Sequence, residues 1–292
     1  MLRLWTVYSA APFAHAAAPS VHTAAPFVRA HVFRPFVHTI LCHNIKNPPS
    51  PVAVPQPYDF AHPNYPAALL SSKTPLITKH VLVTDECHGT PLPYLAAPIP
   101  SPLSSTLLQA LYTLHGTLLL SHGLINADPH PGNVLYDASR EKLSLVDFGQ
   151  LVPVEAQFRE DFARLIVAVE EGDVKTCGAA FLKCGNKVVV KGGEVGEVEA
   201  GGAVAMIHFG GERGRKKGED VLGFGGDEMG KLLTIEESNP QYGMLQRACF
   251  CLGGVGEYMQ VEGGGSHAAM LAPSAREYLA KQKKSLTYER DV

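Results

Sequence analysis

Three polar residues, Asp128, Asn133 and Asp147, have the types and the spacing that a site for a metal ion and phosphate groups requires. Amide and carboxylate oxygens are hard ligands that suit Mg²⁺, which usually completes its shell with phosphate oxygens and water. Asp128 lies five residues before Asn133, and Asp147 opens an Asp-Phe-Gly triplet fourteen residues after Asn133. A lone Asp-Phe-Gly would be a weak signal, but the combined spacing is specific. The pattern indicates a site that positions phosphates and neutralises their charge.

The segment between Asn133 and Asp147 reads as a β-hairpin. Residues 134–137 and 143–146 are short apolar strands, and the polar residues between them form a turn. If Asp137 pairs with Leu143, Asn133 lies directly opposite Asp147, and opposed α-carbons are roughly 4.5–5.5 Å apart. The sequence therefore predicts Asn133 and Asp147 as the metal ligands.

Asp128 lies in a loop that two prolines and a glycine shape. Pro129 and Pro131 restrict the backbone, and Gly132 permits a tight turn beside them. A carboxylate held there can orient the hydroxyl of a phosphoryl acceptor, so Asp128 is predicted as the catalytic residue. Turn capping and strand initiation could explain each polar residue singly, but not the three together at this spacing. His130 is expected to brace the loop by hydrogen bonding rather than to bind metal.

Helical periodicity surrounds this segment. Ser101 and Pro102 predict an N-cap and a first helical position, and Gly123 is predicted to end this helix. A second helix is expected to end at Gly172, and Asp173 is expected to cap a third helix that ends near Gly185. The apolar positions that define the first two helices are Leu103, Leu107, Leu111, Leu114 and Leu118, then Phe158, Phe162, Leu165, Ile166 and Val169.

Composition divides the chain into four predicted parts. Residues 1–75 form an Ala/Pro/His-rich leader that we expect to be disordered, and residues 76–190 form the folded part with the polar site. In residues 191–230, 13 of 40 positions are Gly, which predicts a flexible insertion. Residues 231–285 return to helical patterning, with Met244, Leu245, Ala248 and Leu252 on one side.

Charge argues against a nucleic-acid partner, and hydropathy argues against a membrane-spanning helix. The net charge of −3 gives no basic face for nucleic acid. No apolar run reaches the length of a membrane-spanning helix. Residues 1–58 contain no Asp or Glu and carry scattered Arg, as organelle transit peptides do; a leader without an address fits the same composition.

The catalytic segment resembles that of UbiB/aarF-domain atypical kinases. Residues 126–133, Asn-Ala-Asp-Pro-His-Pro-Gly-Asn, are similar to the catalytic loop of that family, and residues 145–149, Leu-Val-Asp-Phe-Gly, to its metal-binding motif. Residues 81–89 resemble the strand and hinge that line its adenine pocket. The helical segments at 159–173 and 246–248 resemble helices of the family. The resemblance covers about residues 78–190 and, more faintly, 235–282.

The resemblance implies a fold and a set of roles. The fold class is α+β: the large, C-terminal lobe of a protein-kinase-like fold, mainly helical, with a small β-hairpin at the cleft. Asp128 would be the catalytic-loop aspartate, and Asn133 and Asp147 would ligate Mg²⁺. Asp85, Glu86 and Cys87 would form the hinge, with backbone groups offered to the adenine of ATP.

The family also implies a cellular setting. Its members are associated with prenyl-quinone metabolism in mitochondria, plastids and bacteria. A mitochondrial or plastid location is therefore expected. Lipid or quinone-pathway proteins at a membrane surface are the expected partners, beside the nucleotide.

The chain departs from the family pattern in two respects. Asn126 stands where many relatives carry His. A phosphate-covering loop, a strand lysine and its helical glutamate are not found before residue 76, so the small lobe is predicted to be missing or rudimentary.

Three functional hypotheses follow. One is an ATP-dependent phosphotransferase or ATPase, and another is a non-catalytic nucleotide-binding or scaffold relative. The third is a small-molecule kinase of the aminoglycoside or choline kinase kind, which the proline-bracketed loop argues against.

Overall fold

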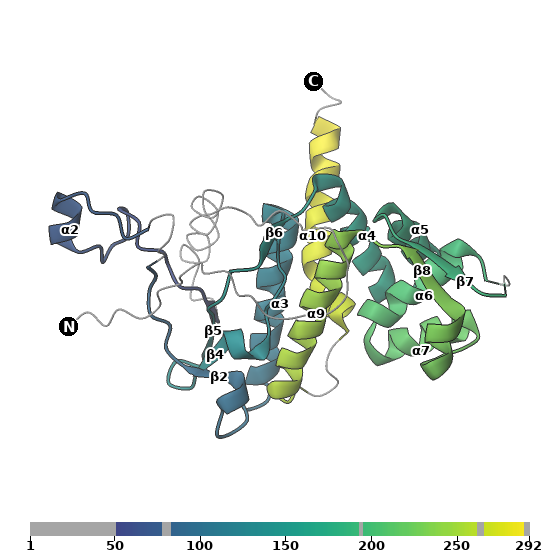
Figure 1. Ribbon diagram of the computed structural model, residues 1–292, viewed down its shortest axis with the longest axis horizontal. Helices are drawn as coiled ribbons and strands as arrows, with labels where there is room; N and C mark the ends of the chain where they lie inside the picture. Colours follow the sequence, from purple (N-terminus) through teal and green to yellow (C-terminus); the bar gives the residue numbers. More distant parts are fainter. Residues whose placement is uncertain (1–50, 78–82, 193–194, 262–265, 289–292) are drawn as a thin grey trace, which may run out of the picture.

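The computed structural model describes residues 51–77, 83–192, 195–261 and 266–288, and combines many helices with three small sheets. Three long helices run alongside one another through the centre of Figure 1: α3 (Leu103–His122), α9 (Pro240–Tyr258) and α10 (His267–Tyr288). The coarse expectation of a mainly helical chain with small sheets is confirmed. No helix of the described residues has the length and apolar character to cross a lipid bilayer.

Helix α3 forms the centre of the core. Its leucines follow the predicted spacing, and Leu107, Leu111 and Leu118 are almost completely buried. Gly123 ends the helix at φ 69°, in the left-handed conformation that favours glycine. The predicted start was wrong by one residue, because Pro102 occupies the N-cap position and Leu103 is the first helical residue.

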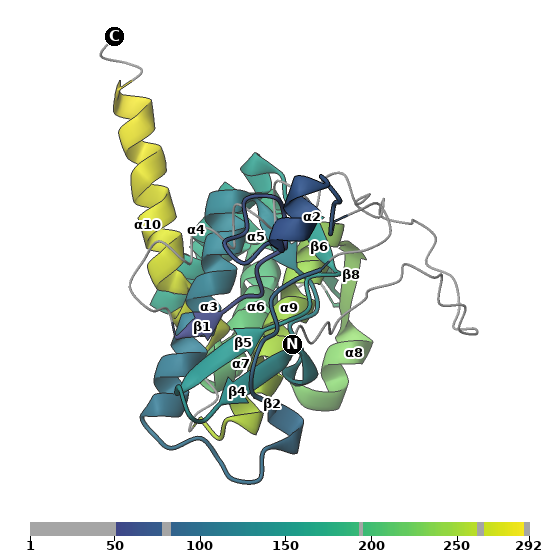
Figure 2. The ribbon, with the colours of Figure 1, turned by 90° about the vertical axis from the view of Figure 1, so that its left-hand side faces the viewer.

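A four-stranded sheet in the order β1-β5-β4-β2 lies beside α3 (Figure 2). Its strands are β1 (Val52–Ala53), β5 (Lys142–Leu145), β4 (Val134–Asp137) and β2 (Thr90–Pro91). Strands β4 and β5 form the predicted antiparallel hairpin, while β1 pairs parallel with β5. The hairpin buries Val134, Tyr136, Leu143 and Leu145 on its inner face. Opposed pairs share a face, so Leu135, Asp137, Lys142 and Ser144 lie on the outer face.

The predicted register of the hairpin was wrong by one residue. Asp137 pairs with Lys142, and the amide of Val146 donates to the carbonyl of Asn133 at 3.0 Å. Val146 therefore lies opposite Asn133, and Asp147 comes one position later. The turn explains the shift: the Asp137 carboxylate accepts the amides of Ser139 and Arg140, and Glu141 adopts φ 52°. The chain therefore reverses within residues 138–141.

A second, two-stranded sheet joins the two ends of the site. Strand β3 (Leu124–Asn126) pairs antiparallel with β6 (Leu151–Pro153), with Asn126 opposite Leu151. One further bond, from the amide of Ala127 to the carbonyl of Gln150 at 3.0 Å, extends the pairing toward Asp128. Residues on both sides of the hairpin are thereby brought together.

Helices α4 (Ala156–Glu171) and α5 (Val174–Lys183) follow the predicted pattern. The phenylalanines of α4 are buried, and Gly172 ends the helix at φ 76°. Asp173 caps α5 by accepting the amide of Thr176 at 3.1 Å. The predicted end of α4 at Gly172 and the predicted cap of α5 at Asp173 are confirmed.

The prediction of a flexible insertion at 191–230 was wrong. Helices α6 (Glu197–Phe209) and α7 (Gly211–Leu222) occupy this stretch, followed by η3 (Gly226–Glu228) and α8 (Met229–Leu232). Several of its glycines are buried and serve close packing instead of flexibility. At Gly202, for example, a Cβ would lie 2.1 Å from the carbonyl oxygen of Val174 in α5. Helices α5 to α7 lie together on one side of the molecule, at the right of Figure 1.

The remaining elements complete the molecule. Strands β7 (Lys187–Val190) and β8 (Leu233–Glu237) pair antiparallel beside α6. Helix α9 buries Leu245, Ala248 and Leu252, as predicted, and α10 packs on α3 and α4.

The leader prediction is corrected in part. Residues 1–50 lie outside the described residues, but residues 51–75 contain β1 and α2 (Ala67–Ser71). Of the strand expected at 81–83, Val81 and Leu82 lie outside the described residues, and Thr84 forms an isolated bridge with Pro57.

Candidate functional site

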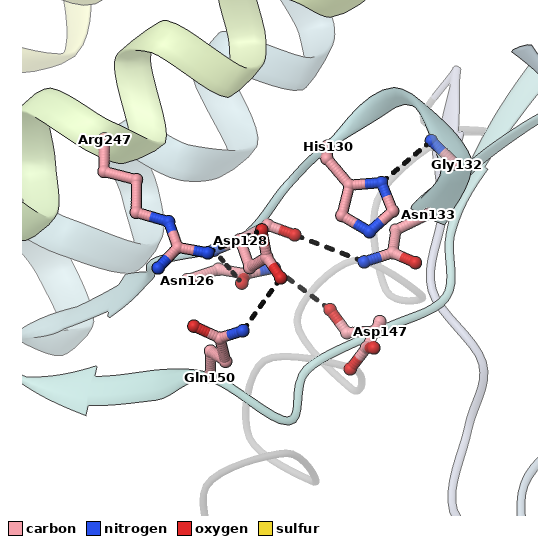
Figure 3. Close-up of polar contacts among 8 residues, drawn as sticks. All are labelled: Asn126, Asp128, His130, Gly132, Asn133, Asp147, Gln150 and Arg247. Atoms are coloured by element: carbon pink, nitrogen blue, oxygen red, sulfur yellow. Dashed lines mark hydrogen bonds and ion pairs between the residues drawn. The ribbon is translucent and has the colours of Figure 1, made fainter. Parts of the chain in front are cut away.

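Asn126 ties together the two loops that carry the predicted site. Its side chain is buried, accepts the amide of Asp128 at 3.2 Å and donates to the carbonyl of Asp147 at 3.1 Å (Figure 3). One amide can do both because it has an acceptor oxygen and a donor nitrogen. Asp128 and Asp147 are thereby held side by side although they are nineteen positions apart in the sequence.

The loop after β3 is fixed by its own side chains. The imidazole of His130 accepts the amide of Gly132 at 3.0 Å through Nδ1, at the start of the short helix η2 (Pro131–Asn133). The expectation that His130 braces the loop is confirmed. A Cβ at residue 132 would lie 2.8 Å from the His130 ring, so any other residue there would displace this ring.

Asn133 and Asp147 lie next to each other at the open end of the hairpin (Figure 3). The Nδ2 of Asn133 donates to the carbonyl of Asp128 at 3.2 Å, which leaves Oδ1 as the outward acceptor. The Oδ1 of Asp147 accepts the amide of Gly149 at 2.7 Å. Among the described residues nothing bonds to Oδ1 of Asn133 or to Oδ2 of Asp147. Each predicted ligand thus has one oxygen without a hydrogen bond.

The carboxylate of Asp128 is held by two residues that the sequence did not single out. Gln150 donates from Nε2 to Oδ2 at 2.8 Å, and Arg247 approaches Oδ1 at 3.3 Å from α9 (Figure 3). Gln150 directly follows the Asp-Phe-Gly triplet, so its position was a usable signal. Arg247 lies 119 residues away, and only the faint similarity of residues 246–248 to a family helix pointed to it.

Cys251 lies one turn beyond Arg247 and belongs to the same surroundings. Burial raises the pKa of its thiol, the charge of Asp128 raises it further, and Arg247 opposes both effects. A thiol with a raised pKa is a poor nucleophile at neutral pH. We therefore assign no chemistry to Cys251.

The predicted hinge residues line a cavity. Asp85, Glu86 and Cys87 border a cavity of about 250 Å³ together with β1 and the outer face of the hairpin, represented by Lys142 and Ser144. Asp85 is fixed by His62, 3.3 Å away, whose ring stacks on Tyr58. Within the described part of the chain, the residues that line this cavity do not include Asp128, Asn133 or Asp147.

The cavity and Asn133 nevertheless share one face of the hairpin. Asp137, Lys142 and Ser144 line the cavity from the outer face. Val146 is two residues after Ser144 and opposes Asn133, so Asn133 continues the same face. Asp137 is four positions after Asn133 along β4, which corresponds to roughly 13 Å. The described residues contain no cluster of three or more His, Cys, Asp or Glu side chains that could hold a metal ion. A metal at this end of the hairpin would therefore depend on the oxygens of Asn133 and Asp147 and on ligands from outside the protein.

Comparisons with known proteins give a family and a distant structural neighbour. The family model of the ABC1 atypical kinase-like domain matches residues 73–181. AarF domain-containing protein kinase 1 of Gallus gallus is 33% identical over 66 residues, which cover 21% of this chain and 13% of that protein. The structure of the Rv3197–erythromycin complex from Mycobacterium tuberculosis aligns with a TM-score of 0.47 at 14% identity, over 86% of this chain and 58% of that one.

The matched region contains the hinge residues and most of the site, but not Arg247, His62 or β1. It includes the loop of Asp128, the hairpin, the Asp-Phe-Gly triplet and Gln150. Residues 73–181 therefore match the ABC1/aarF (UbiB-type) family of atypical kinase-like proteins.

Proposed function

We propose that the chain binds Mg-ATP along the outer face of the hairpin and transfers or hydrolyses its terminal phosphoryl group. The observation that carries the proposal is the double hydrogen bond of Asn126, which holds the loops of Asp128 and Asp147 together. In phosphoryl transfer the protein mainly positions groups and stabilises charge. A buried brace between the two loops serves that purpose.

Asn133 and Asp147 are the proposed ligands of Mg²⁺. The fit rests on the donor set: one amide oxygen and one carboxylate oxygen, both without a hydrogen bond among the described residues. Mg²⁺ typically takes one or two protein oxygens and fills the rest of its octahedron with water and phosphate oxygens. When bound, the ion would neutralise charge on the phosphates.

Asp128 is the proposed catalytic residue. Its side chain remains 23% exposed, so a substrate hydroxyl or water can reach it. A carboxylate has about four acceptor positions, and Gln150 and Arg247 use two of them. The remaining positions can orient the attacking hydroxyl and accept its proton.

The cavity beside Asp85, Glu86 and Cys87 is the proposed site of the adenine. Its support is the shared face: the cavity lies at the turn end of the hairpin, and the proposed metal ligands lie at the other end. A nucleotide laid along this face would have its base in the cavity and its phosphates near Asn133. The arrangement would be that of the large lobe of a kinase-like fold.

A non-catalytic nucleotide-binding relative is the second candidate, and one observation favours it. In the described residues before Thr84, the chain has the two-residue strand β1 and the five-residue helix α2. Neither supplies the strand lysine that pairs with nucleotide phosphates in active kinases. Binding without turnover is the expected behaviour of such a relative.

The test measures Mg-ATP binding by isothermal titration calorimetry and ATP turnover by phosphate release. The proposal expects Mg-dependent binding that Asp147→Asn weakens, because a neutral amide is a poorer Mg²⁺ ligand. Asp220→Asn, at an exposed carboxylate on α7, is the matched control and should leave binding unchanged. Binding with turnover supports the enzyme, and binding without turnover supports the second candidate. The absence of binding, or binding indifferent to Mg²⁺ and to Asp147→Asn, rejects the proposed site.

We extend the proposal to a role in prenyl-quinone metabolism in a mitochondrion or plastid. Its support is the family together with the acid-free composition of residues 1–58. Imaging of the full chain with a C-terminal fluorescent tag, beside quinone measurements in cells that lack the protein, tests both parts. A cytosolic signal or unchanged quinone content argues against this role.

A further inference from the structure

Helix α9 forms a wall beside the loop that carries Asp128. A Cβ at Gly254 would lie 3.8 Å from Cγ of Pro131, so this face of the helix lies against the loop. Arg247 is two turns before Gly254 on the same face of α9. The guanidinium therefore approaches Asp128 from an element that is remote in sequence.

The backbone and both carboxylate oxygens of Asp128 have defined partners. Asn126 binds its amide, Asn133 binds its carbonyl, Gln150 binds Oδ2 and Arg247 binds Oδ1. Gln150 alone would let the carboxylate rotate about its bond to Oδ2. A second donor on the other oxygen fixes the plane of the carboxylate (Figure 3).

We propose that Arg247 is a positioning residue, which holds the carboxylate of Asp128 in the orientation that accepts the proton of the attacking hydroxyl. The inference rests on the proposed function and adds to it a residue of α9. In the step concerned, the hydroxyl oxygen bonds to the γ-phosphorus, the bond from that phosphorus to the bridging oxygen breaks, and Asp128 takes the proton. ADP carries away the bonding electrons.

A purely structural role for Arg247 fits its surroundings poorly. The side chain is 58% exposed, and its ion pair with Asp128 spans 3.3 Å. Exposed ion pairs contribute little to folding stability. Replacement of Arg247 should therefore leave the protein folded, so that an effect on turnover can be measured separately from an effect on folding.

The experiment compares steady-state ATP hydrolysis, with Mg-ATP as substrate and water as acceptor, in the wild type and in Arg247→Ala. Loss of orientation should lower kcat by about 10- to 100-fold, while KM and the calorimetric Kd for Mg-ATP stay unchanged. Millimolar guanidinium should restore part of the kcat of Arg247→Ala, because the cation can occupy the space that the side chain leaves. Arg247→Gln, in which that space stays filled, should not be rescued.

Two controls distinguish positioning from other effects. Arg164→Ala removes an exposed arginine of α4 that pairs with Glu160 at 2.6 Å, and it should leave kcat unchanged. In the background of Asp128→Asn, Arg247→Ala should cause no further loss, because Arg247 acts through Asp128.

The outcomes separate this inference from the proposed function. An active wild type with an equally active Arg247→Ala overturns the inference, as does an equal further loss in the Asp128→Asn background. Binding of Mg-ATP by the wild type without any turnover also overturns it, while nucleotide binding stands. Failure of the wild type to bind Mg-ATP removes the proposed function itself, and the inference with it.

Discussion

The side-chain amide of Asn126 donates to the main-chain oxygen of Asp147 at 3.1 Å, from a side chain that is 1% exposed. This bond connects the loop before the hairpin to the loop after it. It fixes the backbone of Asp147, while the other end of the amide fixes that of Asp128. The separation of the two aspartates therefore depends on a residue that itself has no acidic or basic chemistry.

Replacing Asn126 by leucine should loosen the site and weaken the fold. The side chain is similar in size, but the amide of Asp128 and the carbonyl of Asp147 lose their partner. Unpaired groups of this kind cost about 1–3 kcal/mol, so the free energy of unfolding in urea should fall by about that amount. Mg-ATP binding should weaken with it. Asn64→Leu, at an exposed asparagine, should change neither quantity.

Local signals in the sequence were enough to predict the elements around the site. Gly123 and Gly172 end their helices in the left-handed conformation, and Asp173 caps the next one, because these effects depend on neighbouring residues alone. The hairpin followed from two apolar segments and a polar turn. The proximity of Asn133 and Asp147 was likewise predictable. The predicted direct opposition of the two residues was wrong, because Val146 lies opposite Asn133.

Features that depend on distant residues, or on the backbone conformation of a turn, were not predictable. The register was set by the conformation of Glu141 and the carboxylate of Asp137, which a count of apolar residues does not contain. The glycines of 191–230 looked like flexibility because the sequence does not show that a second helix packs against them. Arg247 reaches Asp128 only through the packing of α9 on η2.

Gly178→Ala tests the close contact between α5 and α6. A Cβ at this position would lie 1.8 Å from the carbonyl oxygen of Val198, so the helices would have to separate. We expect the free energy of unfolding to fall by about 3 kcal/mol or more.

Gly243→Ala is the matched control for that substitution. This glycine lies in α9, and a Cβ there would meet nothing within 4 Å. Alanine in an open helical position should raise stability by about 0.5–1 kcal/mol. Equal midpoints of thermal unfolding for the two variants would show that α5 and α6 are not in close contact.

Glu141→Gly tests the turn that sets the hairpin register. Glu141 adopts φ 52°, a left-handed conformation that costs about 1 kcal/mol in a residue with a Cβ. Glycine removes this strain but gains freedom in the unfolded chain, so a net gain of about 0.5 kcal/mol is expected in urea unfolding.

Ser139→Gly provides the opposite case in the same turn. It deletes the hydroxyl that donates to Oδ1 of Asp137 at 2.6 Å, and stability should fall by about 1 kcal/mol. A gain in this variant, or a loss in Glu141→Gly, would contradict the observed turn.

Buried histidines should make the fold sensitive to acid. Burial lowers the pKa of His115 to about 4, although the bond of its Nδ1 to the carbonyl of Leu111 acts in the opposite direction. Burial likewise lowers the pKa of His208 and of His267 to about 4. In the unfolded chain these groups take up protons below about pH 6.5, whereas in the folded chain they do so only near pH 4. Stability is therefore present above the unfolded pKa and is lost as the pH falls from about 6.5 toward 4.

His115→Leu isolates one of these protons. The Nε2 of His115 is buried without a hydrogen bond among the described residues, so leucine removes a polar group that has no partner there. Urea unfolding across about pH 5 to pH 6 should show a slope lower by about 1 kcal/mol per pH unit than in the wild type. Above about pH 7, where the histidine is neutral in both states, the two proteins should have the same slope. An unchanged slope in the acid range would mean that His115 already takes up its proton in the folded protein, because water reaches its ring.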